Sequence, residues 1–181
     1  GLESGSEKMR KEVLRRPPYT NDELVNFCDI AKTYGLEIVF FVLFGLPGET
    51  IDDYMVTVKV CRRAQPFYVY LSIYYPYLGT DLATLAIEMG LLTPENLTPE
   101  AERSRAVLNL DGFSSTRIRF EYIVFWLRVY LFKWPLFKVL YHVLANYVRA
   151  YPRMFNYFRK MRYNNWIVKI ITRRYAAFNS D

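Results

Sequence analysis

The chain has 181 residues, of which 52% are apolar and 18% aromatic, which is enough for one ordinary domain with a packed core. This composition excludes a disordered chain, and two cysteines are too few for a disulfide framework or for a cysteine-only metal site. The net charge of +6 is unevenly spread. Residues 1–110 carry 11 Lys+Arg and 15 Asp+Glu, a net of −4, whereas residues 111–181 carry 13 and 3, a net of +10.

Helix signals come first along the chain. A short charged helix is predicted after the turn at residues 4–7, and it ends before Pro17, because proline lacks a backbone donor and restricts the residue before it. Thr20 and Glu23 have the spacing of a capping box at the start of a second helix. Gly35 is the expected end of that helix, since glycine adopts the left-handed conformation there most easily.

Two apolar runs predict strands. Residues 38–44 are seven consecutive apolar residues bounded by glycines, which predicts a strand buried on both faces, as in a parallel sheet covered by helices. Residues 67–75 predict a second strand, and residues 50–64 and 81–89 predict the helices that follow the two strands. Such strand–loop–helix units are typical of α/β barrels and doubly wound sheets.

The second part of the chain has a different character. Residues 93–118 are polar and hold two prolines, which predicts a linker with a short helix. Residues 119–181 are basic and aromatic, and we expect helices there, with a break at Pro135 and a last helix near 166–175. We therefore divide the chain into an α/β part at residues 1–92, the linker, and a basic helical region.

Three loops carry the candidate chemistry. Residues 1–7 place a carboxylate and a hydroxyl before a glycine turn, residues 45–50 (Gly-Leu-Pro-Gly-Glu-Thr) follow the first strand, and residues 74–80 follow the second. In βα folds, ligands bind at the carboxyl ends of the strands, where glycines allow close backbone approach. The simpler interpretation of each loop is a tight turn and helix cap, with Glu49 opposing the helix dipole. Together the loops predict one shared site.

In this order and approximate spacing, the loops resemble those of radical S-adenosylmethionine (SAM) enzymes. The resemblance covers residues 1 to about 92 and is closest to the cobalamin-dependent branch of the family. It rests on five stretches: Gly1–Glu7, Arg15–Thr20, Phe44–Thr50, Tyr75–Asp81 and Met89–Leu92. The implied α/β fold is the C-terminal half of a partial (β/α)6 TIM-like barrel, followed by an α-helical C-terminal region. Residues 3–4 would end the fourth strand, and the two predicted strands would be the fifth and sixth.

The resemblance implies a cofactor site, but it assigns no catalytic residue. The ribose and carboxylate of SAM would lie near Glu3 and Ser4, and the adenine near Gly45, Leu46, Pro47, Tyr75 and Pro76. The family reaction is the reductive cleavage of SAM at a [4Fe–4S] cluster, and the resulting 5′-deoxyadenosyl radical abstracts hydrogen from a substrate. Cobalamin is a further candidate cofactor, bound by a domain outside this chain.

The cluster ligands are not found in this chain, because the family's Cys-x-x-x-Cys-x-x-Cys motif is absent. Cys28 and Cys61 are 33 residues apart on predicted core faces, which favours two buried apolar side chains over metal ligands. We therefore expect the C-terminal part of a longer protein, a fragment that is inactive alone and whose partner is its own missing N-terminal half. The alternative is a non-catalytic binding or membrane-surface module derived from such a barrel.

The basic aromatic region has three interpretations. It is a helical subdomain with a solvated basic face, a membrane-surface element, or a nucleic-acid-binding element, and the acidic first part makes nucleic acid the least favoured partner. The expected membrane contacts are Trp126, Arg128, Tyr130, Lys133, Trp134, Lys138 and Tyr141. His142 lies in an apolar run and is predicted to be core. No signal peptide is present, so we expect a cytoplasmic protein, peripheral at the membrane, with a small apolar or lipid-like substrate.

Overall fold

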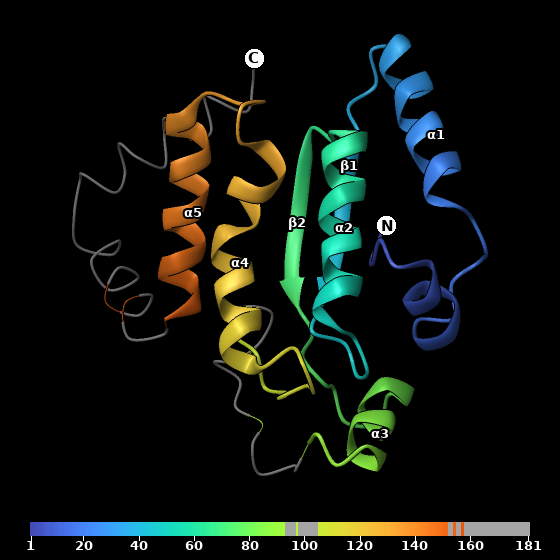
Figure 1. Cartoon of the computed structure of the whole chain (residues 1–181), viewed down its shortest axis with the longest axis vertical. Helices are drawn as coiled ribbons and strands as arrows, with labels where there is room; N and C mark the ends of the chain where they lie inside the picture. The colour runs from blue at the N-terminus through green and yellow to red at the C-terminus, as the bar shows by residue number, and fades with distance from the viewer. Residues whose placement is uncertain (93–96, 98–104, 152–153, 155–156, 158–181) are drawn as a thin grey trace.

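The computed structural model describes residues 1–92, 97, 105–151, 154 and 157 (Figure 1). Its elements are a π-helical turn η1 (Met9–Val13), α1 (Asn21–Thr33), β1 (Val39–Phe44), α2 (Ile51–Ala64), β2 (Tyr68–Ile73), α3 (Asp81–Glu88), α4 (Ser115–Tyr130) and α5 (Leu136–Ala150). The predicted α/β class is confirmed. The helix expected near 166–175 lies outside the described residues, as does most of the linker before residue 105.

The helix boundaries follow local hydrogen bonding. The predicted capping box is confirmed: the Glu23 backbone N–H donates to the Thr20 hydroxyl, and the Glu23 carboxylate accepts from the Thr20 backbone N–H. α1 ends before Gly35, which has a φ of 70°. The first predicted helix is shorter than expected, because η1 ends at Val13 and Arg15 has a left-handed φ of 50°.

The two strands are parallel and pair in register from Val39–Tyr68 to Phe44–Ile73. Glu3 adds a third parallel position on the other side of β1, where its N–H donates to the Phe41 carbonyl at 2.7 Å and its carbonyl accepts from the Leu43 N–H at 2.8 Å. The sheet order is therefore Glu3, β1, β2, with α1 and α2 as the crossovers. The described residues form an open sheet and not a closed barrel.

Only one face of the sheet is covered, so the prediction of a strand buried on both faces is wrong. Phe40, Val42 and Phe44 are at most 3% exposed, whereas Val39 is 37% and Phe41 53% exposed. The crossover helices cover one side of the sheet, and no described element covers the other, where the Phe41 ring stacks on a Tyr70 ring at 5.0 Å. An apolar run could not reveal this difference, because it shows hydrophobicity and not what lies over it.

The C-terminal helices extend the same core. α4 packs on α2 and β2, and α5 packs on α4, so that the helices follow one another across the molecule (Figure 1). The rings of Phe44, Tyr54 and Phe113 have centroid separations of 4.9 to 6.5 Å and join β1, α2 and the residues before α4. Leu108 and Leu110 are also buried. In the described part of the chain, no helix has the length and apolar content to cross a membrane.

Two aromatic residues expected at a membrane surface lie in this core instead. Trp126 and Tyr130 are 2% and 1% exposed, because they point from α4 toward β2 and α5, and they stack at 5.4 Å. His142 stacks on Trp126 at 4.1 Å, which confirms its predicted core position. Burial and the nearby charge of Lys138 lower the pKa of His142 to about 4, so this imidazole is neutral at physiological pH.

A buried ion pair crosses the inner side of α4. The Glu121 side chain is fully buried, and its carboxylate accepts two hydrogen bonds from the Arg128 guanidinium, at 2.5 and 2.8 Å. Arg117 lies 2.9 Å from the same carboxylate, one helical turn earlier. The bonds satisfy both carboxylate oxygens, as a buried charge requires. Glu121 is also the last acidic residue before a stretch of 59 residues, 122–180, without Asp or Glu.

The close packing of the turn after Glu3 on α2 can be tested at Gly5. A Cβ atom on Gly5 would lie 2.4 Å from the Thr57 Cα and 2.7 Å from the Thr57 backbone N of α2. We expect Gly5→Ala to lower the free energy of unfolding by about 3 kcal/mol, because backbone must move. Gly35→Ala is the control, since a Cβ there meets nothing within 4 Å and adds only left-handed strain of about 1 kcal/mol. Equal losses in urea unfolding would contradict the close packing of this turn on α2.

Candidate functional site

The three loops predicted to form a site lie at one edge of the sheet. Because Glu3, β1 and β2 run parallel, the segments that follow them leave at the same carboxyl edge. The Tyr74 N–H donates to the Phe44 carbonyl at 2.8 Å and joins the last two loops directly. The side chain of Met89, at the end of α3, lies 3.8 Å from the position of a Cβ on Gly48. The second and third loops therefore lie side by side at this edge, and the first loop leaves the sheet at the same edge.

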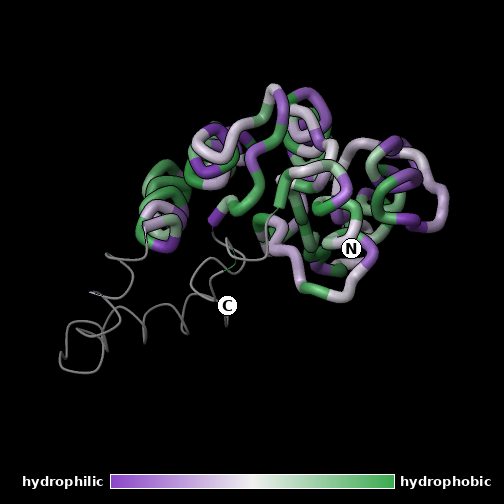
Figure 2. The backbone as a smooth tube through the Cα atoms, turned by 90° about the horizontal axis from the view of Figure 1, so that it is seen from below, coloured by the Kyte–Doolittle hydropathy of each residue, from purple (hydrophilic) through white to green (hydrophobic). Residues whose placement is uncertain are grey.

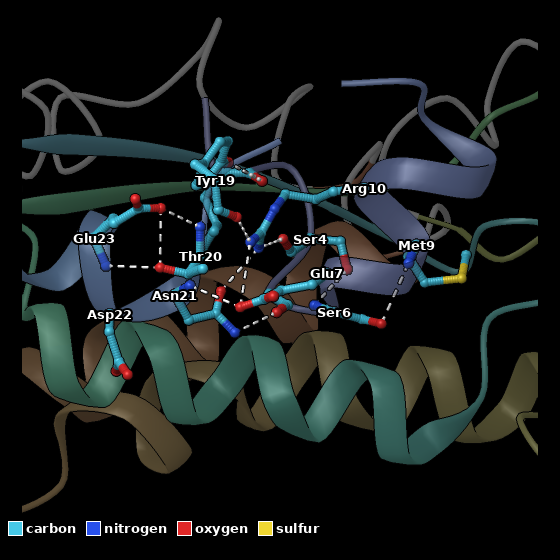
Figure 3. Close-up of polar contacts among 12 residues, drawn as sticks. Ser4, Ser6, Glu7, Met9, Arg10, Tyr19, Thr20, Asn21, Asp22 and Glu23 are labelled. Carbon is cyan, nitrogen blue, oxygen red and sulfur yellow. Dashed lines mark hydrogen bonds and ion pairs between the residues drawn. The ribbon is translucent and has the colours of Figure 1, made fainter. Parts of the chain in front are cut away.

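The first loop is held by a buried guanidinium that the sequence analysis missed (Figure 3). Arg10 is 2% exposed, and it donates to the carbonyls of Ser4 and Tyr19 at 2.8 and 2.9 Å and to the Asn21 side chain at 2.9 Å. The Asn21 amide in turn donates to the Gly5 carbonyl at 2.9 Å. Arginine suits this role because its planar fork satisfies several acceptors at once. The sequence pattern of a charged helix did not indicate this role of Arg10, because the partners of its guanidinium are mostly backbone carbonyls.

Ser4 faces the helix layer. It is fully buried, and its hydroxyl lies 3.5 Å from the Thr57 hydroxyl and accepts from the Ser6 N–H at 3.2 Å. The Thr57 hydroxyl also accepts from the Gly5 N–H at 2.8 Å. The Ser6 hydroxyl donates to Asp53 at 2.6 Å. These contacts make the Ser-Gly-Ser turn a rigid support between the sheet and α2.

Glu3 presents a partly accessible charge in the first loop. Its side chain is 19% exposed, and its carboxylate lies 3.0 Å from the Arg16 guanidinium, which is 52% exposed. Glu3 has a φ of 58°, which is uncommon for a residue with a side chain and is a form of strain found at functional sites. The pair offers an acceptor for hydroxyls and a donor for a carboxylate. Arg16 lies in a stretch that the resemblance covers, but it was not predicted as a site residue.

Glu49 organises the second loop from inside. It is 1% exposed, and one carboxyl oxygen accepts from the N–H groups of Gly45 and Leu46. The other oxygen, Oε1, has no hydrogen-bond partner among the described residues. Burial raises the pKa of the Glu49 carboxyl to about 8, against the lowering effect of these two backbone bonds. The sequence predicted only that Glu49 would oppose the helix dipole. It did not predict that the carboxylate would hold the loop through two backbone N–H groups.

The remaining predicted site residues are mostly covered. Leu46, Pro47 and Pro76 are buried, and Gly45, with a φ of 75°, lies against Ile118 of α4. Tyr75 is half-buried and meets the Tyr77 ring edge-on at 5.2 Å. Next to it, the Tyr74 hydroxyl is buried without a partner among the described residues, and burial raises its pKa to about 12.

This edge of the sheet has buried polar atoms, but the described residues offer no metal-binding cluster. Glu49 Oε1 and the Tyr74 hydroxyl are both buried without a hydrogen-bond partner among the described residues. In contrast, the described residues contain no group of three or more His, Cys, Asp or Glu side chains able to hold a metal. Cys28 and Cys61 are both 0% exposed, as predicted, and burial raises the pKa of each thiol.

The Glu49 carboxyl predicts a pH dependence of stability. Its pKa is raised from 4.5 to about 8, so between about pH 5 and 8 the folded chain keeps a proton that the unfolded chain has released. Stability therefore falls as pH rises through this window, by roughly 3 to 5 kcal/mol in total. Glu49→Gln keeps an oxygen for both backbone N–H groups, and it should remove this decline in urea unfolding measured from pH 5 to 8. The wild type and Glu49→Gln showing the same decline of stability with pH would contradict this prediction. Glu37→Gln, at an exposed position, is the control and should decline like the wild type.

The sequence of this chain is similar to parts of several known proteins. No protein-family model matches the chain. A tRNA-2-methylthio-N(6)-dimethylallyladenosine synthase of Sulfurihydrogenibium sp. (strain YO3AOP1) is 28% identical over 123 residues, 67% of this chain and 26% of that protein. A synthase of the same name from Akkermansia muciniphila is 30% identical over 86 residues, 46% of this chain and 18% of that protein.

A third relative has a different name. An uncharacterized methyltransferase of Pyrococcus horikoshii is 29% identical over 132 residues, 71% of this chain and 28% of that protein. The chain thus spans between 18% and 28% of the length of these three curated relatives. At this level the similarities support the radical SAM superfamily for the chain.

Proposed function

We propose that this chain supplies the last strands of a radical SAM barrel and the adenosine side of its SAM site. The observation that carries the proposal is the parallel order of Glu3, β1 and β2, which brings the three loops to one carboxyl edge. In this proposal the open sheet face with Phe41 and Tyr70 is the inner wall of a partial (β/α)6 barrel. The N-terminal half of the same protein would complete the barrel and provide the three cysteine ligands of the cluster.

The residues of this chain would bind and orient SAM. Glu3 would accept hydrogen bonds from the ribose hydroxyls, while Arg16, released from Glu3 or shared with it, would meet the SAM carboxylate. The backbone of Gly45 and the side chains of Leu46, Pro47, Tyr75 and Pro76 would border the adenine. A [4Fe–4S] cluster held by cysteines outside this chain would supply the reducing chemistry for cleavage of SAM. Glu49 would not contact SAM itself. Its hydrogen bonds to the Gly45 and Leu46 N–H groups would fix the shape of the loop that borders the adenine.

We further propose an apolar or lipid-like substrate. The exposed side chains on the open sheet face are hydrophobic or aromatic, with Val39, Phe41 and Tyr70 between 37% and 54% exposed. A barrel lumen lined in this way favours a substrate that buries apolar surface. The similarity to a protein named as a methyltransferase is compatible with the cobalamin-dependent branch, with cobalamin bound outside this chain.

RNA is a second candidate substrate, and the names of the tRNA-modifying relatives favour it. The eleven Lys and Arg residues between 122 and 180 also suit a polyanion. A non-catalytic module derived from a barrel is the remaining alternative. A coding region upstream with Cys-x-x-x-Cys-x-x-Cys would support the enzyme, whereas an upstream region without three such cysteines would support the module.

SAM binding tests the proposed site. Isothermal titration of the full-length protein with its cluster reconstituted should show SAM binding, and Glu3→Gln should weaken it about tenfold, because a charge-assisted hydrogen bond is lost. Asp22→Asn is the matched control, since Asp22 also pairs with an arginine, Arg63, but on the helix layer. Absence of SAM binding to the wild type would overturn the proposed function. An unchanged affinity in Glu3→Gln would overturn the role of Glu3.

A further inference from the structure

α5 has two apolar faces, and the described elements of the fold bury one of them. Val139, His142, Asn146 and Ala150 are buried against the rest of the fold, and the Asn146 amide donates to the Tyr122 carbonyl of α4 at 2.8 Å. The outward side carries the α5 face, six residues that are each 39% to 66% exposed: Leu136, Phe137, Leu140, Tyr141, Leu144 and Tyr147. A helix on the surface of a water-soluble protein would present polar residues there. The largely hydrophobic colouring of α5 in Figure 2 reflects this composition.

The turn before α5 continues the apolar surface. Phe132 is 92% exposed, and its φ of 65° is in the left-handed region, which is strained for a bulky residue. The turn thus holds a phenylalanine ring outward, where water gives it no favourable contact. Strain and apolar exposure at one residue indicate a surface selected for contact with something other than water.

The described charges next to this surface include two lysines. Lys133 is exposed in the turn next to Phe132, and the Lys138 ammonium lies 3.9 Å from the centre of the Trp134 ring. Residues 122–180 contain eleven Lys or Arg and no Asp or Glu, so no acidic side chain of this stretch opposes an anionic partner. Aliphatic and aromatic residues flanked by lysines are the pattern of a helix lying in the interface of an anionic bilayer.

We propose that the α5 face, with Phe132, docks on the surface of a membrane that contains anionic phospholipids. The leucines and Phe137 would enter the boundary between headgroups and acyl chains, while Lys133 and Lys138 would contact lipid phosphates. RNA fits the face less well, because Leu136, Leu140 and Leu144 offer neither charge nor rings for base stacking. This docking does not depend on SAM binding, and it goes beyond the proposed function.

Flotation with lipid vesicles tests the proposal on the full-length protein. The protein should float with vesicles of phosphatidylcholine and phosphatidylserine at 7:3, and at least tenfold less with pure phosphatidylcholine. Lys133→Glu/Lys138→Glu and, separately, Leu140→Ser/Leu144→Ser should each reduce flotation at least tenfold, because one removes the electrostatic attraction and the other the apolar insertion. Both leucines are exposed, so thermal unfolding should be unchanged.

Two control variants separate a local surface from a general effect. Lys59→Glu/Arg62→Glu on α2 changes the net charge equally at exposed positions, and Phe27→Ser/Ile30→Ser removes equally exposed apolar residues from α1. Both should float like the wild type. Wild-type protein that stays with the unbound fraction would overturn the proposal, as would controls that lose flotation equally. If the wild type does not float, a dimer that Leu140→Ser/Leu144→Ser converts to a monomer would instead assign the face to a second copy of this chain, and tRNA binding that the lysine variant abolishes would assign it to RNA.

Discussion

The parallel pairing of β1 with β2 is the constraint on which the rest of the structure depends. Parallel strands need crossovers, and α2 supplies one by packing its Tyr54 ring against Phe44. The same pairing sends the loops at Gly45 and Tyr74 to one edge, joined by a backbone hydrogen bond. With the helices on one face, the other face stays open. A candidate site and an unfinished sheet are therefore two results of one topology.

The helix caps and strand positions could be predicted from sequence because their causes are local. Thr20 and Glu23 lie three residues apart and satisfy each other, whatever surrounds them. The clamps of the site could not be predicted in this way. Arg10 binds carbonyls up to nine residues away and Asn21 eleven away, and Glu49 is buried only because other elements close over it. Sequence spacing carries no information about acceptors that the tertiary fold brings together.

In the basic aromatic region, composition alone also failed to separate buried residues from exposed ones. Trp126 and Lys138 both suited a membrane surface on composition, yet the tryptophan is buried and the lysine lies beside the exposed face. What separates them is their position around the helices. α4 is enclosed by α2, β2 and α5, so its large rings fill the core, and its Glu121 is buried with two arginine partners. Among the described helices, α5 contacts α4 at the end of the row, and its remaining apolar residues are exposed.

The described residues thus leave two apolar surfaces exposed, and the charges beside each surface indicate a different partner. The open sheet face ends at Glu3 and Arg16, an acid and a base that already neutralise each other, so a partner there gains little from net charge and must match shape and apolar area. That requirement suits a folded segment of protein. Beside the α5 face, Lys133 and Lys138 lie in a stretch without acidic residues. A cover for that face must bring negative charge and a fluid apolar layer together, which an anionic bilayer does and a barrel half does not.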